Sequence, residues 1–358
     1  MKTIGQAVLN GYREEFGKAV TTGYDLSNAN ATVIQFPDAV KVWGGIQTPL
    51  LQRIGNERAI GIVDRWEDVQ IAAVAENAQV EGILAASLTG RSVVPVVRTN
   101  TCQIASELIP VSGSALREAR NGVYGRALQD LMAFQIETLM PTMIGSIALS
   151  AWFGVEVTQA SAGDASSARK MSGLIGTVGD AGFDDGMLTT TGRATVVDWA
   201  SAEMEQDAFD AWLEGIANAG ASANDLPTAV YTSLKAQRKI GTFENTIPVQ
   251  ATQGAGNADV MVGRRVTKYW APWGAALDIV WEPQNVHSAT ATNNWMAALC
   301  EPNIAMRSLA GSPEVGGVEV IDLPQRGDLT EVQFLWEGCV KAEVFKGHGV
   351  AKDFTCTI

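Results

Sequence analysis

Two strand-like segments between residues 59 and 104 constrain the fold most strongly. Residues 59–70 (AIGIVDRWEDVQ) alternate around a tryptophan, and residues 92–104 (SVVPVVRTNTCQI) are rich in β-branched side chains. Between them, residues 75–90 (AENAQVEGILAASLTG) are small and polar, without strong periodicity. This pattern predicts an extended β-hairpin with a long tip, and Pro95 predicts an edge or a bulge in its second strand. Such a hairpin has little core of its own, so it needs another surface to lie on.

A long helix is predicted after the hairpin. Residues 111–140 contain apolar side chains at helical spacing, and Ser112 or Ser114 can cap the start. A helix of roughly 25 residues would be about 40 Å long. Pro141 is expected to end or kink it. Its buried stripe is predicted at Leu128, Met132, Ile136 and Met140, flanked by Leu131 and Leu139.

The most apolar run, residues 139–157, contains Pro141, Gly145 and three hydroxyl residues. A membrane-spanning helix needs about 20 strongly apolar residues. We therefore expect buried core here and no membrane span.

The rest of the chain mixes helical and strand-like patterns. Helices are predicted at residues 166–178, 201–218, 226–240 and 291–300, and strands at 258–270, 274–281 and 329–345. In the helix 201–218, Met204, Ala208, Trp212 and Ile216 line one face. Residues 1 to about 40 have the character of an arm. The mixed order indicates the α+β class.

The segment VTKYWAPWGAALDIVW (residues 266–281) contains Trp270, Trp273 and Trp281 but few groups capable of acid–base or nucleophilic chemistry. Each indole ring buries on the order of 200 Å² when it is packed. Packing in a core or an interface is therefore expected, in preference to a ligand cage.

Charged residues make up 18% of the chain and hydrophobic residues 46%, with a net charge of −13. Soluble domains average about 25% charged residues, so much of this surface is neutral, which favours contact with other chains. The negative charge argues against a nucleic-acid reader but allows a protein that encloses nucleic acid.

Recognisable catalytic motifs are absent from the sequence. The two histidines, His287 and His348, lie in no hydrolase motif, and Cys102, Cys300, Cys339 and Cys356 are too far apart for a typical zinc site. The four cysteines are expected to be free, buried thiols of a reducing compartment. Acidic pairs such as Glu203/Glu205 and the loop 180–186 are expected to be solvated. We predict no catalytic residue, no cofactor and no metal.

Several short segments, in order, resemble the major capsid proteins of tailed bacteriophages with the HK97-type fold, and in particular the SU10-like group. They cover about residues 40–350. They are Thr48-Pro49-Leu50, Trp66-Glu67-Asp68, Glu81-Gly82, residues 100–104 (NTCQI), residues 111–114 (VSGS), residues 168–174 (ARKMSGL), residues 266–269 (VTKY) with Trp273-Gly274, and Gly327-Asp328 leading into a strand around Glu337. The sequence departs from the group at Thr101-Cys102 and at Pro141.

The resemblance implies an HK97-like capsid fold and a domain layout. It comprises an N-terminal arm (1–45), an extended hairpin called the E-loop (57–98), a peripheral domain with a long spine helix (99–155 and 326–358), and a mixed α/β axial domain (156–325). The hairpin without a core would then lie on a neighbouring subunit. Residues predicted at contacts between subunits are Trp66, Glu76, Glu81, Arg91, Trp270 and Trp273.

The resemblance also implies the partners. Many copies would form hexamers and pentamers of a virion shell, assembled in the host cytoplasm around double-stranded DNA that is not read by sequence. A portal protein is expected, and the use of a decoration protein is left open. If Met1 is the native start, the arm is too short for a fused scaffolding domain, so a separate scaffolding protein, or none, is expected. No lysine lies between Val42 and Arg169, which predicts no isopeptide crosslink through an E-loop lysine.

Two alternatives remain open at this point. One is the shell of a cellular nanocompartment with the same fold, as in encapsulins. The other is a carboxylate-dependent hydrolase, which would need two converging carboxylates in a deep pocket.

Overall fold

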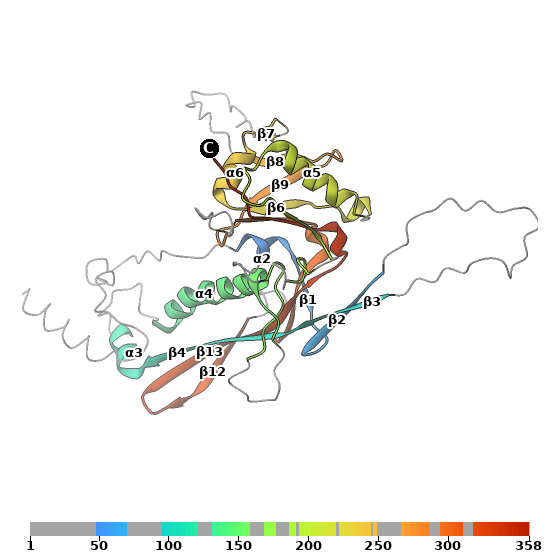
Figure 1. Cartoon of the computed structure of the whole chain (residues 1–358). Helices are drawn as coiled ribbons and strands as arrows, with labels where there is room; N and C mark the ends of the chain where they lie inside the picture. The colour runs from blue at the N-terminus through green and yellow to red at the C-terminus, as the bar shows by residue number, and fades with distance from the viewer. Residues whose placement is uncertain are drawn as a thin grey trace, which may run out of the picture. The chain divides into compact units, whose positions relative to one another are not determined.

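The computed structural model describes residues 48–69, 95–120, 131–157, 168–176, 186–190, 193–219, 222–244, 246–248, 266–285, 294–310 and 318–357 (Figure 1). The chain forms two compact units. The described part of the first unit lies within Ile104–Ala148 and Ala310–Glu337, and that of the second within Thr48–Gln103, Leu149–Leu309 and Gly338–Ile358. The predicted arm and the hairpin tip fall outside the described residues.

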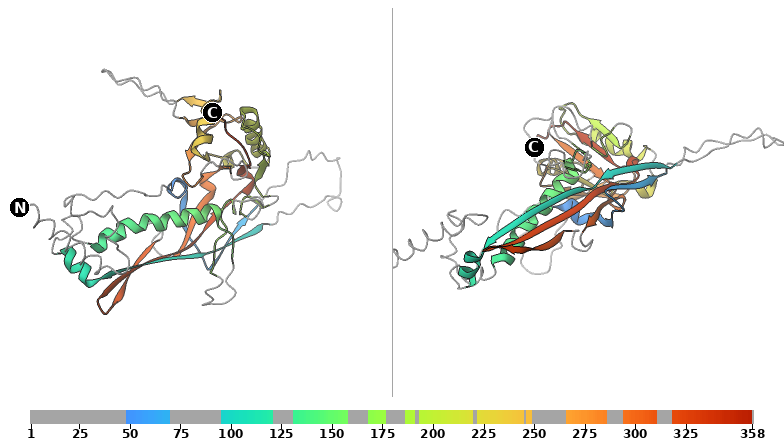
Figure 2. Two further views of the ribbon diagram at one scale, coloured as in Figure 1. Left: turned by 60° about the vertical axis from the view of Figure 1, so that its left-hand side comes forward. Right: turned by 90° about the horizontal axis from the view of Figure 1, so that it is seen from below.

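The first unit is built from long strands and one long helix. Its strands are β4 (Gln103–Ser112), β12 (Glu319–Arg326) and β13 (Leu329–Ala342), and its helices are α3 (Gly113–Arg120) and α4 (Leu131–Phe153). β12 and β13 form an antiparallel hairpin, and β4 also pairs with β13. Figure 2 shows α4 running along this sheet. β4, α4 and β13 each continue into the second unit.

Helix α4 excludes one of the two outcomes expected at Pro141 and corrects the predicted buried stripe. It passes through Pro141 and continues to Phe153, so the proline does not end it. Pro141 and Glu137 are both exposed, so the carbonyl that loses its bond to the proline nitrogen faces water. The buried stripe is also shifted by one residue from the prediction. Met132, Ile136 and Met140 are half-buried, and the buried positions include Leu131, Gln135, Met143, Ile147, Ala151 and Trp152.

By length and composition alone, α4 is the described helix that could cross a membrane. Its C-terminal end nevertheless packs in a protein core. The ring of Trp152 lies 5.4 Å from the ring of Tyr231 and 4.9 Å from that of Trp295. This agrees with the expectation that the run 139–157 includes core.

The second unit contains a seven-stranded sheet. Its strand order is β5 (Thr195–Asp198), β14 (Gly349–Lys352), β10 (Trp295–Leu299), β6 (Ala229–Thr232), β9 (Ala276–Trp281), β8 (Val266–Trp270) and β7 (Thr246–Pro248). The pairs β6–β9 and β14–β5 are parallel, and the other pairs with a described register are antiparallel.

The two faces of this sheet pack differently. Helices α5 (Gln206–Ala217) and α6 (Leu234–Ile240) contribute Phe209, Trp212, Leu213, Ile216, Ala236 and Ile240 to a core that includes Val230, Ile279 and Met296. Trp152 contacts Tyr231 and Trp295, the strand neighbours that point to the opposite face. The short helix α2 (Pro49–Arg53) bonds to the sheet through Arg53, which pairs with Asp278 at 2.7 Å.

Three helix predictions were wrong in this unit. Residues 226–240 form the strand β6 followed by the shorter helix α6, and residues 295–299 form the strand β10. Both strands are buried along their whole length, so they lack the alternation that identifies a half-buried strand. Within the predicted helix 166–178, the described residues 168–176 are not helical, and Lys170 bridges to Val157.

The predictions for α5, for β8 and β9, and for the cysteines agree more closely with the structure. Helix α5 is shorter than predicted, with Met204 buried ahead of it. The predicted strands 258–270 and 274–281 are present, within the described residues, as β8 and β9, which pair antiparallel. The turn between them uses Gly274 at φ +85°, a value that favours glycine. All four cysteines are free and buried, as predicted.

Among its described residues, the second unit also contains the single-turn 3-10 helices η4 (Ala223–Asp225), η6 (Glu301–Asn303) and η8 (Phe345–Gly347). His348 follows η8 directly and is buried. Its Nδ1 accepts the N–H of Cys300 at 3.1 Å, so the proton is on Nε2, which donates to the carbonyl of Glu343 at 3.0 Å. Burial lowers the pKa of His348 to about 4, and the bond to Glu343 opposes this only in part.

We expect the free energy of unfolding to decrease as the pH is lowered, because His348 is buried in its neutral form. Its folded-state pKa of about 4 lies below the ordinary value of about 6.5, so the unfolded chain takes up the proton first. The stability from neutral His348 is complete above about pH 6.5 and is lost progressively toward pH 4, by about 3 kcal/mol in total. Urea unfolding of the purified protein between pH 4 and 8 measures this. In His348→Gln the slope over this window should be smaller, and an equal slope would contradict the assignment.

Candidate functional site at the root of the β2–β3 hairpin

Strands β2 (Val63–Asp68) and β3 (Val96–Thr101) pair antiparallel, as the sequence predicted for the base of the hairpin. Their side chains alternate between two faces. The inner face contains Asp64, Trp66 and Asn100, which are buried. The outer face contains Val63, Arg65, Glu67, Val97 and Thr99, which are exposed. The hairpin root is therefore fixed to the body on one side and open on the other.

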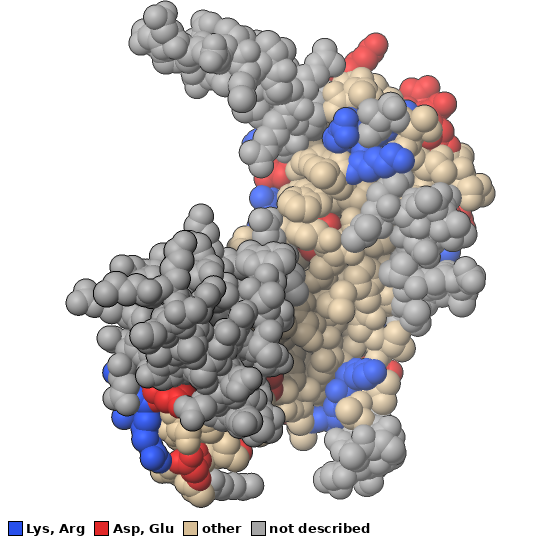
Figure 3. Space-filling model, turned by 90° about the vertical axis from the view of Figure 1, so that its left-hand side faces the viewer, with Lys and Arg blue, Asp and Glu red and all other residues tan. Residues whose placement is uncertain are grey.

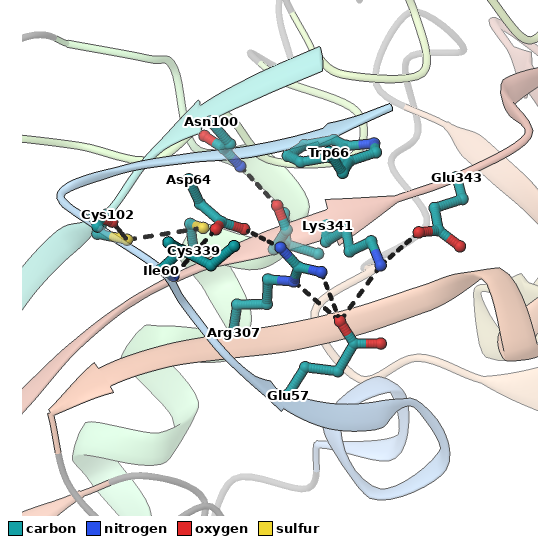
Figure 4. Close-up of polar contacts among 12 residues, drawn as sticks. Glu57, Ile60, Asp64, Trp66, Asn100, Cys102, Arg307, Cys339, Lys341 and Glu343 are labelled. Atoms are coloured by element: carbon teal, nitrogen blue, oxygen red, sulfur yellow. Dashed lines mark hydrogen bonds and ion pairs between the residues drawn. The ribbon is translucent and has the colours of Figure 1, made fainter. Parts of the chain in front are cut away.

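A chain of ion pairs lies under the inner face (Figure 4). The guanidinium of Arg307, on β11 (Ile304–Ala310), bonds to Asp64 at 2.7 Å and to Glu57, on β1 (Gly55–Arg58), at 2.8 Å. The ammonium of Lys341, on β13, reaches the same Glu57 oxygen at 3.2 Å and also pairs with Glu343. Three carboxylates thus share two cations, and the ion pairs connect β1, β2, β11 and β13.

The electrostatics explain why the groups occur together. The Asp64 side chain is fully buried, and an isolated buried carboxylate is very costly, so Arg307 is needed to compensate it. Burial alone would raise the pKa of Glu57, but hydrogen bonds from Arg307 and Lys341 outweigh it and lower this pKa. Burial likewise opposes the charge of Arg307, and its bonds to Asp64 and Glu57 raise its pKa.

Two neutral side chains fasten the hairpin root to the C-terminal part of β13. The indole N–H of Trp66 donates to the carbonyl of Ala342 at 2.9 Å, and the amide of Asn100 donates to the carbonyl of Val340 at 2.6 Å. Arg98 also stacks over the ring of Phe345 at 4.7 Å. A hairpin cannot bury a core by itself. These contacts therefore hold the hairpin root in place.

The segments 100–104 and 168–174, which are far apart in sequence, bind each other. Asn100 donates to the carbonyl of Ser172 at 3.0 Å and accepts its N–H at 2.8 Å. Gln103 accepts the N–H of Met171 at 3.4 Å. A Cβ at Gly173 would lie 2.5 Å from the backbone nitrogen of Gly154, so only glycine allows this close approach.

A similar pairing occurs in the first unit, between residues 112–114 and Asp328. The N–H of Gly113 donates to the carbonyl of Asp328 at 2.5 Å, and Arg117 pairs with its carboxylate at 2.9 Å. A Cβ at Gly113 would lie 2.3 Å from that carboxylate. Asp328 follows Gly327, which has φ +65°, in the turn between β12 and β13. This contact links the start of α3 to the β12–β13 turn.

The six residues predicted at contacts between subunits differ in their surroundings. Trp66 is 6% exposed and binds its own chain, so its ring has little surface left for a neighbour. Trp270 is 51% exposed on β8, whereas Trp273 packs against the core of the second unit. Glu76, Glu81 and Arg91 lie outside the described residues. These inter-subunit contacts stay predictions.

Sequence reasoning missed Glu57, Asp64, Arg307 and Lys341 as a group. They lie on four different strands, β1, β2, β11 and β13, and no spacing rule relates Arg307 or Lys341 to partners 243 to 284 positions away. Asn100 was part of a quoted segment, but its role in joining Ser172 and Val340 was not foreseen. A weak signal was available, because Asp64 and Trp66 occupy alternate positions of one strand and so share a face.

His348 and Glu203, which the sequence offered as candidates for chemistry, carry structural bonds. Both ring nitrogens of His348 bond to backbone. Glu203 is bound by Lys239, Thr355 and Thr357. Within the described ranges, no group of three or more His, Cys, Asp or Glu residues is placed to hold a metal ion.

Comparison with known proteins identifies the chain. The family described as SU10 major capsid protein matches residues 19–355. No curated protein sequence matches. Among solved structures, the chain is similar to the cyanophage A-1(L) capsid asymmetric unit, with TM-score 0.60 and 14% identity, covering 89% of this chain and 96% of that one. It is also similar to a structure titled Mycobacterium phage Bobi, with TM-score 0.51 and 10% identity, covering 96% and 99%. A third is the capsid of a native GTA particle, with TM-score 0.51 and 9% identity, covering 93% and 99%.

The shared fold is that of HK97-type capsid subunits, as the resemblance implied. The chain belongs to the SU10 major capsid protein family. It is a major capsid protein of a tailed phage shell, a structural protein and no enzyme, and it self-assembles into capsomers. Neither the nanocompartment nor the hydrolase alternative gains support.

Replacing Asn100 should loosen the hairpin root. Asn100→Ala leaves the carbonyls of Val340 and Ser172 and the N–H of Ser172 without this partner. A buried group left unpaired costs about 1–3 kcal/mol. The two bonds to Ser172 are only part-buried, so water can replace part of their loss, and we expect a loss of roughly 2–4 kcal/mol in the free energy of unfolding. Urea denaturation measures it. Thr99→Ala, on the exposed face of the same strand, is the control and should change stability by less than about 0.5 kcal/mol. Equal effects of the two substitutions would contradict the assignment.

Proposed function

We propose that the hairpin (57–98) lies across a neighbouring copy in each capsomer and links the subunits of the shell. The carrying observation is that the root is fastened on its inner face while its outer face exposes Val63 and Val97, at 40% and 55%. The outer face mixes these apolar side chains with Arg65, Glu67 and Thr99, a composition typical of interfaces between chains. Heterologous contacts of this kind generate closed rings.

We propose the domain layout and the types of capsomer on the same basis. The arm (1–45), the peripheral domain (99–155 and 326–358) and the axial domain (156–325) would take their places as in other HK97-type subunits, with hexamers and pentamers as the capsomers. Glu76, Glu81 and Arg91 would contact the neighbour from the hairpin tip. Trp270, half-exposed on β8, would contact it from the axial domain, with Trp273 beside it.

We further propose that the shell encloses double-stranded DNA without reading its sequence. The net charge of −13 disfavours adhesion of phosphates. On the face of the molecule in Figure 3, the lysine and arginine side chains form small groups, and acidic side chains lie beside several of them. Assembly would take place in the host cytoplasm, which the four free thiols suit. A portal protein would take part, with a separate scaffolding protein or none, and with or without a decoration protein.

Electron microscopy of the purified chain, alone and with candidate scaffolding proteins, tests the proposed contact through one substitution. The wild-type chain should form rings or closed shells. Val97→Asp places a charge in the proposed interface, where its desolvation is costly, so assembly should be lost while the circular dichroism spectrum stays unchanged. Val97→Thr keeps the shape without a charge and should assemble. If Val97→Asp assembles at the wild-type yield, the outer face is not the contact.

Mature particles should contain no covalent ladder of the E-loop-lysine type. No lysine lies between Val42 and Arg169, so the hairpin supplies no amine for an isopeptide bond. On a denaturing gel of mature particles, the protein should run as a single monomeric band. A ladder of multiples, persisting after reduction of disulfides, would overturn this expectation.

A further inference from the structure

Two cysteine thiols meet beneath the hairpin root. The sulfur of Cys102 lies 3.8 Å from the sulfur of Cys339, and both residues are fully buried. Figure 4 shows the pair next to the ion-pair chain of Asp64 and Arg307. The residues are 237 positions apart in sequence, so their contact is a product of the tertiary fold.

The pair joins the parts that hold the hairpin root in place. Cys102 lies between β3 and β4, and its N–H donates to the carbonyl of Ile62 at 2.8 Å, next to the start of β2. Cys339 is on β13, one residue before Val340, which accepts the amide of Asn100. A bond between the two sulfurs would fasten the hairpin to the same strand that its hydrogen bonds already reach.

We propose that Cys102 and Cys339 form a latent disulfide, a covalent modification site that closes when the hairpin root meets a disulfide oxidant of the glutathione type. A sulfur–sulfur bond is about 2.05 Å long, so the sulfurs need to approach by somewhat less than 2 Å. Side-chain rotation with small backbone adjustments supplies a movement of this size.

The chemistry requires two exchange steps. The thiolate of one cysteine attacks a sulfur of glutathione disulfide, forms a mixed disulfide and releases one glutathione thiolate. The thiolate of the second cysteine then attacks the protein sulfur of the mixed disulfide and releases the second glutathione. The two cysteines lose two protons and two electrons in total, and glutathione disulfide is reduced to two glutathione molecules.

The closed structure protects the thiols. No surface of either residue is exposed. The hydrogen bond with Cys102, followed by burial, raises the pKa of Cys339 and so keeps its thiol protonated. Since the thiolate is the reactive form, oxidation depends on a transient opening of the hairpin root. The bond would then form from the open state and hold the root closed afterwards. This inference rests on the contact of the two sulfurs, and does not depend on where the hairpin lies in the shell.

The test uses the full-length protein, purified under reducing conditions. N-ethylmaleimide labelling first finds the urea concentration at which Cys102 becomes reactive. At that concentration a fresh sample is incubated with glutathione disulfide, returned to buffer without urea, blocked and digested. Mass spectrometry then identifies the linked peptides.

We expect a peptide joining Cys102 to Cys339 as the main product. It should be absent from Cys102→Ala and from Cys339→Ala, and it should persist in the matched control Cys300→Ala. The thermal midpoint of the oxidised wild-type protein should exceed that of the reduced protein, because the bond closes a long loop, whereas oxidation should not raise the midpoint of Cys339→Ala. Separate mixed disulfides on the two cysteines, or linkage to Cys300 or Cys356 as often as to each other, would overturn the proposal.

Discussion

The ion pair between Arg307 and Asp64 is the contact on which the hairpin root depends. The Asp64 carboxylate is fully buried and would be very unfavourable without a cation. Arg307 provides one from β11 and also binds Glu57 on β1, which Lys341 on β13 binds as well. One neutralised charge therefore determines the positions of three strands relative to β2. A buried pair of this kind adds little net stability. Because the pair forms only when β2 lies beside β11, it favours this position of the hairpin root over others.

The alternation of β-strands lets the hairpin face its own chain on one side and remain open on the other. Asp64, Trp66 and Asn100 point inward because they are on one face, and Val97 and Thr99 point outward for the same reason. A shift of one residue in the strand pairing would exchange the two sets. The bonds of Trp66 to Ala342 and of Asn100 to Val340 oppose such a shift. A hairpin root that is held on its inner face and exposed on its outer face is compatible with the proposed role of the hairpin as a link between copies.

Local patterns predicted elements well where one face is buried and the other exposed. The alternation around Trp66 predicted β2, and glycine at position 274 agreed with the turn between β8 and β9. The patterns failed where an element is apolar on all sides. Strand β10 was predicted as a helix because its residues, WMAAL, are buried throughout and show no alternation. The buried stripe of α4 was one residue out of phase, since an apolar helix offers several equivalent faces and tertiary packing selects one.

The sequence by itself determined the α+β class, the paired β2–β3 base of the hairpin, the four free thiols and, through its ordered short segments, the capsid family. These follow from local periodicity, composition and motif order, which are written along the chain. Only the tertiary structure decided that Asn100 binds Ser172, that Arg307 neutralises Asp64, and that Cys102 touches Cys339. The physical reason is that each of these contacts joins residues separated by 72 to 243 positions. No local rule links such positions until the strands are paired.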